Sequence, residues 1–121
     1  MDNLLEQYYL KQPEPLQGCL LALKDIILKL DENITQRRTW QIPCFYYKDK
    51  KLSYLWVNKK KIQMGFIEDK NIYPKQKDVI LKDKTERLII DPNADIPIEY
   101  IIKQLKKRIS LYRRFQKTVP T

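Results

Sequence analysis

The spacing of apolar residues along this chain changes from a helical period to a strand period and then back again. From Pro15 to Asp31, apolar side chains recur every three or four residues, the pattern of a helix that buries one face. From Thr39 to Ile67 they tend to alternate, as in β-strands, and from Pro97 to Tyr112 the helical period returns. This order predicts an α+β fold, a two-layer sandwich in which an antiparallel sheet of about four to five strands carries the N- and C-terminal helices on one face.

The alternating part also predicts where the individual strands lie. We expect one strand over residues 39–48 (TWQIPCFYYK), broken or bent at Pro43, because proline cannot donate to a β-ladder. The period of two begins only after the polar residues 31–38 (DENITQRR), in which no strand is expected. Short polar turns at residues 48–51 and 58–61 should join this strand to two further strands, over residues 52–57 and 61–67. A polar segment with a short helix or turn is expected next, followed by a last strand over residues 87–90.

The length of 121 residues predicts a single domain over residues 1–121, with its core between about residues 5 and 114. No apolar run approaches the roughly 20 residues that cross a bilayer. The first residues, MDNLLEQYYL, lack the basic-then-apolar layout of a signal peptide. We therefore expect a cytoplasmic protein without a membrane partner.

The chain contains no histidine. Nucleophile pairs of the Ser-His and Cys-His kind are thereby excluded, together with the side chain that most often serves as a general base near neutral pH. Cys19 and Cys44 lie in apolar surroundings without a metal-binding spacing, and we interpret them as buried thiols. These features favour a binding protein over an enzyme, and no catalytic residue is assigned.

A strong excess of positive charge gives the first binding hypothesis. Lysine and arginine number 24 against 15 aspartates and glutamates, a net charge of +9. Such a surface attracts RNA, DNA or another polyanion, and Tyr46, Tyr54 or Trp56 could stack on bases. The alternative is an ordinary solvated basic surface. The candidate polyanion-binding residues are Arg37, Arg38, Lys59, Lys60, Lys61, Lys106, Lys107, Arg108, Arg113 and Arg114.

The aromatic strands suggest a second hypothesis, a pocket for a small molecule or peptide. Its apolar lining would come from Trp40, Tyr46, Tyr54 and Trp56, with Arg87 as an orienting charge. The alternative is that these rings fill the core, where burial of a large side chain contributes about 1.5–3 kcal/mol. We expect core packing for Trp40 and for Phe45, whereas Tyr46 and Tyr47 could take either role.

Four segments of the chain resemble the YdhG-like family, a domain of unknown function, over about residues 5–114: QPEPLQGCLLALKDIILKL, ITQRRTWQIPCFYY, KLSYLWVNKKKIQMGFI and LKDKTERLII. The most specific feature is the spacing of Trp40, Pro43 and Phe45. The resemblance implies a cytoplasmic bacterial protein of one domain, a helix–sheet sandwich similar in layout to frataxin. Some members of the family are described as frataxin-like intracellular iron chaperones.

Iron is the cargo that this resemblance implies, and an iron-recipient protein or a polyanion would then be the partner. The chain carries Gln36 where many relatives have a glutamate, which removes an oxygen ligand of the kind that iron favours, and Gln41 where many have a glycine. No ligand set is assigned, and no cofactor is firmly implied. The candidate carboxylates, which could equally be surface charges, are Asp2, Glu6, Glu14, Asp25, Asp31, Glu32, Glu68 and Asp69.

Overall fold

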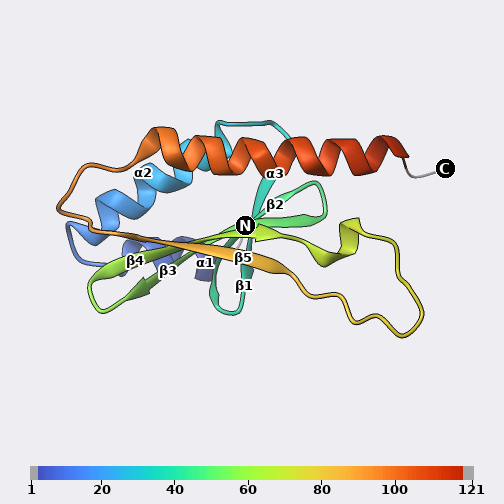
Figure 1. The fold of residues 1–121 in the computed structure, drawn as a ribbon. Helices are drawn as coiled ribbons and strands as arrows, with labels where there is room; N and C mark the ends of the chain where they lie inside the picture. The colour runs from blue at the N-terminus through green and yellow to red at the C-terminus, as the bar shows by residue number, and fades with distance from the viewer. Residues whose placement is uncertain (1–2, 119–121) are drawn as a thin grey trace.

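A computed structural model describes residues 3–118 of the chain. Its five strands form one antiparallel sheet in the order β1-β2-β3-β4-β5, and three helices accompany it (Figure 1), which confirms the expected α+β sandwich. No helix in this part of the chain is long and apolar enough to cross a membrane. The elements are α1 (Asn3–Leu10), α2 (Leu16–Leu28), β1 (Ile34–Thr39), β2 (Ile42–Tyr47), β3 (Lys50–Asn58), β4 (Lys61–Glu68), the short 3₁₀ helix η1 (Lys70–Ile72), β5 (Lys84–Ile90) and α3 (Ile98–Thr118).

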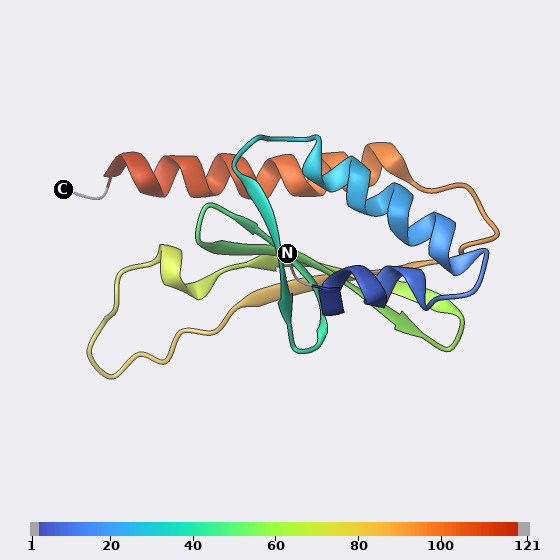
Figure 2. The same cartoon turned by 180° about the vertical axis from the view of Figure 1, so that it is seen from behind.

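Helices α2 and α3 cover the same face of the sheet. The apolar stripe of α2 is buried at Leu20, Leu23 and Ile27, and that of α3 at Ile101 and Leu105. These side chains belong to one core cluster together with strand residues of β2, β3, β4 and β5. Both views show α3 lying along the sheet with α2 beside its N-terminal half (Figures 1 and 2). Both stripes expected from the sequence therefore pack against the sheet.

The start of the sheet differs from the expectation, because residues 39–48 are not one strand. Residues 34–38, in which no strand was expected, belong with Thr39 to β1, and the chain then turns at Trp40 and Gln41 into β2. Pro43 lies inside β2, opposite Arg38 of β1. The alternation of β1 escapes notice because Ile34 is its only fully buried residue. A polar strand at the edge of a sheet carries little hydrophobic signal.

Two of the tight turns use residues that rarely occupy the left-handed region of backbone conformation. Trp40 and Gln41 have φ angles of 55° and 64°, and Lys59 and Lys60, between β3 and β4, have φ angles of 51° and 64°. Two successive residues with positive φ give a hairpin turn the twist that suits its strands, a role in which asparagine and glycine predominate. This conformation is uncommon for a side chain as bulky as that of tryptophan.

The pairing of the strands divides the sheet residues between two faces. The face under the helices holds buried side chains such as Phe45, Leu55, Met64 and Phe66. The other face, which we call the open face, carries the alternate residues and has none of the three helices stacked across it (Figure 2). The open-face residues of the five strands are Thr35, Arg37, Thr39, Ile42, Cys44, Tyr46, Lys51, Tyr54, Trp56, Asn58, Lys61, Gln63, Gly65, Ile67, Thr85, Arg87 and Ile89.

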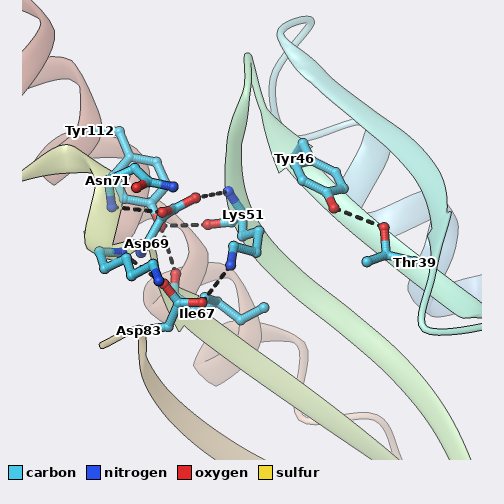
Figure 3. A network of polar contacts seen from close by, with 9 residues as sticks. Thr39, Tyr46, Lys51, Ile67, Asp69, Asn71, Asp83 and Tyr112 are labelled. Atoms are coloured by element: carbon cyan, nitrogen blue, oxygen red, sulfur yellow. Dashed lines mark hydrogen bonds and ion pairs between the residues drawn. The ribbon is translucent and has the colours of Figure 1, made fainter. Parts of the chain in front are cut away.

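A buried polar network joins α3 to the end of the sheet (Figure 3). The Tyr112 hydroxyl accepts the Asp69 N–H at 2.9 Å and lies within donating distance of the carbonyls of Lys51 and Ile67, at 2.5 and 2.8 Å. The Asp69 carboxylate accepts the N–H groups of Lys51 and Asn71, each at 2.8 Å. Burial raises the pKa of Tyr112, so the hydroxyl keeps its proton. The network fixes the segment that follows β4.

Candidate functional site

One row of residues crosses the open face from edge to edge. The pairing of the strands places Arg37 beside Cys44, Cys44 beside Tyr54, Tyr54 beside Gly65, and Gly65 beside Arg87. Adjacent strands lie about 4.8 Å apart, so the two arginines are separated by roughly 19 Å of sheet. The row therefore presents a guanidinium group near each edge and an aromatic ring between them.

The ring of Tyr54 occupies the middle of this row because Gly65 leaves room for it. A Cβ atom on Gly65 would lie 1.9 Å from Cε2 of Tyr54, so the ring lies directly over the glycine. The Tyr54 hydroxyl accepts a hydrogen bond from the Gln63 side chain at 2.7 Å. The absent side chain and the hydrogen bond together hold the ring across β4, with part of its surface exposed to solvent.

Apolar surface continues beyond this row toward the turn between β3 and β4. Trp56 lies two residues after Tyr54 on the same face, opposite Gln63, which in turn pairs with Ile89. Trp56 is 40% exposed and Ile89 is 61% exposed. Large exposed apolar side chains that gather on one face are characteristic of binding surfaces.

Trp40, expected in the core, is 63% exposed at the turn between β1 and β2, and that expectation was wrong. Trp40 lies in the turn after the last paired residues, Thr39 and Ile42, so its side chain does not follow the alternation that buries Phe45. Its ring lies 6.0 Å from the Lys51 ammonium group. A strained backbone and an exposed indole both oppose stability at this position, which points to a use for the ring outside folding.

Tyr46 lies over the β1–β2 part of the open face. Its hydroxyl is 2.8 Å from Oγ1 of Thr39 (Figure 3), and the Arg37 guanidinium lies 4.6 Å from its ring centroid. Cys44 is fully buried on this side of the sheet, and burial raises the pKa of its thiol. The thiol is therefore protonated near neutral pH, as expected for an inert cysteine.

The strand residues of the open face include four cations and no carboxylate. Carboxylates at the ends of the strands pair with three of the cations: Arg37 with Asp49 at 3.3 Å, Lys51 with Asp83 at 2.6 Å, and Lys61 with Asp91 at 3.0 Å. The hydrogen bond to Asp83 raises the pKa of Lys51. Arg87 makes no ion pair with any residue between positions 3 and 118.

The candidate polyanion-binding residues do not form one surface. Lys59 and Lys60 are exposed in the β3–β4 turn, whereas Lys106, Lys107 and Arg114 are exposed on α3, in the layer opposite the open face. Arg38 is exposed on β1 but alternates away from the open face.

Two of the candidate arginines on α3 are engaged by other side chains of the protein. Arg108 is 5% exposed, stacks on Phe66 and pairs with Glu86 at 3.5 Å, so its assignment to a surface patch was wrong. The apolar stripe of α3 brings this residue under the edge of the sheet. Arg113 donates to Asp31 at 2.5 Å and to the Tyr47 hydroxyl at 3.0 Å.

The carboxylates considered for iron are scattered over the molecule. Between residues 3 and 118, no three His, Cys, Asp or Glu side chains lie close enough together to hold a metal ion. Asp31 pairs with Arg113, Glu68 accepts from Tyr73, and Glu14 accepts the Gly18 N–H. Asp69 is buried in the network of Tyr112, while Glu6, Asp25 and Glu32 are exposed, and Asp2 lies outside the described residues. Residues 3–118 therefore offer no preformed cluster of side chains for a metal ion.

Two hollows lie away from the aromatic candidates. One of about 310 Å³ is formed mainly by the segment after β4, including Lys70, Tyr73 and Leu81. The other, of about 290 Å³, lies between α1, α2 and β1, beside Tyr9 and Lys24. The residues proposed for an aromatic pocket lie instead on the open face, with Tyr54, Trp56 and Arg87 close together and Trp40 next to Lys51.

Sequence reasoning missed Lys51 and Ile89 as members of this site. Lys51 was expected in a turn, yet its side chain lies between Trp40 and Asp83. For Ile89, the sequence did carry a signal: it lies two residues after Arg87 in the last expected strand, so both side chains face the same side of the sheet. Comparison with known proteins adds no assignment, since no family model, no curated protein and no solved structure matches the chain.

Proposed function

We propose that the protein binds single-stranded nucleic acid on the open face of its sheet. The observation that carries the proposal is the placement of Tyr54 and Trp56 beside Arg87, a cation without an ion pair among the described residues. Single-strand binding surfaces combine aromatic side chains that stack on bases with cations that contact phosphates.

The two rings can receive bases because Tyr54 is held in place and Trp56 is exposed. Tyr54 lies over Gly65 with its hydroxyl bonded to Gln63, and Trp56 is 40% exposed. A ring that is already ordered loses little conformational entropy when a base stacks on it. Stacking of a base on an aromatic side chain contributes about 1–3 kcal/mol.

The charges on the open face suit a phosphate backbone. The strand residues of this face supply only cations, and Lys59 and Lys60 extend the positive charge beyond the β3–β4 turn. Arg87 is the strongest phosphate candidate because no carboxylate within residues 3–118 pairs with it. The absence of acidic groups among the open-face strand positions disfavours a basic protein partner and favours a polyanion.

Fluorescence anisotropy of a labelled oligothymidylate of about 12 nucleotides tests the proposal. We expect saturable binding that weakens as salt rises, because phosphate contacts release counterions. Arg87→Gln should weaken binding about tenfold, since a hydrogen bond to a charged group is lost. Lys107→Gln, which removes the same charge from the outer side of α3, should change it less than about twofold. Absence of binding, or equal losses in the two variants, would contradict the proposal.

A further inference from the structure

The two rings on β3 are too far apart for neighbouring bases that remain stacked on each other. Tyr54 and Trp56 occupy successive positions on the same face of one strand. A β-strand rises 3.3–3.4 Å per residue, so their Cα atoms are about 6.7 Å apart. Stacked bases follow one another at about 3.4 Å along a nucleic-acid strand. Two bases that each lie on one of these rings must therefore separate from each other.

The protein holds Tyr54 in a position that does not close this gap. The Tyr54 ring is seated over Gly65 and bonded to Gln63, so its position is set by β4 as well as β3. Gln63 also lies directly opposite Trp56 in the pairing of β3 with β4. The spacing is thus a property of the sheet, and the bound strand has to adapt to it.

We infer that the open face selects single strands whose bases stack weakly on one another, that is, pyrimidine runs over adenine runs. The inference rests on the proposed function and specifies its substrate class. A pyrimidine strand is flexible and gives up little base–base stacking when it spreads over the rings, whereas an adenine strand must first be unstacked. Preferences of this kind follow from stacking strength and backbone flexibility and need no hydrogen bonds to base edges.

The test compares oligothymidylate and oligoadenylate DNA of equal length, about 12 nucleotides, at the same salt concentration. We expect oligothymidylate to bind about fivefold tighter or more. Equal affinities, or tighter binding of oligoadenylate, would overturn the inference and leave the proposed function standing. If neither strand binds, the proposed function itself fails, and an apolar protein surface becomes the alternative occupant of the open face.

A substitution at Tyr54 distinguishes the effect of ring spacing on the pyrimidine preference from the effect of charge. Tyr54→Leu keeps an apolar side chain over Gly65 and leaves all cations of the open face in place. It leaves a single aromatic ring on β3. Because one ring does not require two bases to separate, we expect the ratio of the two affinities to fall toward one, with the salt dependence unchanged. Arg87→Gln should instead weaken both strands by the same factor. A preference that persists undiminished in Tyr54→Leu would refute the spacing argument.

Discussion

The ring of Tyr54 covers Gly65 of the neighbouring strand so closely that a Cβ atom at position 65 would lie 1.9 Å from Cε2 of the ring. The absence of a side chain at Gly65 therefore makes room for an aromatic ring on the open face. Its φ angle is not positive, so the requirement for glycine comes from the ring and not from the backbone.

Gly65→Ala should accordingly displace the Tyr54 ring and break its hydrogen bond with Gln63. We expect a loss of about 1–3 kcal/mol in the free energy of unfolding, measured with urea, as is typical of overpacking. In a Tyr54→Ala background, Gly65→Ala should lower the free energy of unfolding much less, because the ring that would clash with the new Cβ atom is absent. Additive effects of the two substitutions would show that the ring does not rest on the glycine.

Trp40→Asn should leave the protein as stable as before or more stable. Asparagine tolerates the positive φ of 55° at this position better than tryptophan does, and little buried surface is lost because the ring is 63% exposed. Thermal unfolding gives the stability, and strand binding should weaken at the same time. Gln41→Asn is the matched control, since it relaxes the other residue of the turn and leaves the ring in place. A marked drop in melting temperature for Trp40→Asn alone would indicate a structural role for the indole.

Much of the fold could be predicted from the sequence, because burial of one face imposes its period on the apolar residues. The stripe of Leu20, Leu23 and Ile27 is buried as its spacing indicates. The strand β1 could not be recognised, because it lies at the sheet edge and buries only Ile34. Without that strand, Trp40 was assigned to a strand interior when it belongs to a turn.

The site was harder to predict than the fold because it depends on register. Arg87 and Tyr54 become neighbours only through Gly65, which lies between them on a third strand. Their residue types suggested a ligand contact, but no local pattern shows which face each would occupy, since β3 carries apolar residues on both faces. Likewise, the sequence could not show that Arg108 is unavailable to a polyanion, because its ion pair with Glu86 of β5 depends on how α3 packs on the sheet.

Tyr112→Phe should destabilise the protein without affecting the open face. The substitution leaves the Asp69 N–H without its acceptor in a buried site, which costs about 1–3 kcal/mol. Tyr100→Phe is the control, since the Tyr100 ring packs on Phe66 and its hydroxyl makes no hydrogen bond within residues 3–118. Urea unfolding should separate the two variants, while strand binding stays unchanged in both. Equal stabilities of the two variants would contradict the role of the network.

Asp83 should make the stability sensitive to acid. Burial opposes its ionisation, but hydrogen bonds from Lys51 and the Lys70 N–H outweigh burial, and the pKa is lowered. A carboxyl group whose pKa is lower in the folded state contributes stability that is present above its unfolded pKa of about 3.9 and lost as the pH falls through the folded value. The urea midpoint should therefore fall less steeply below about pH 4 in Asp83→Asn than in the wild type. If the urea midpoints of the two proteins fall equally steeply below about pH 4, the contribution of the Lys51–Asp83 pair is refuted.

The central claim, that nucleic acid binds on the open face, is tested most directly by the protein's own fluorescence. The chain has two tryptophans: Trp56 lies on the open face, and the ring of Trp40 lies 6.0 Å from the ammonium group of Lys51, an open-face residue. Titration with unlabelled oligothymidylate should quench their emission to a saturating level, and added salt should reverse the quenching. Emission that stays constant at low salt while nucleic acid is added would contradict the account.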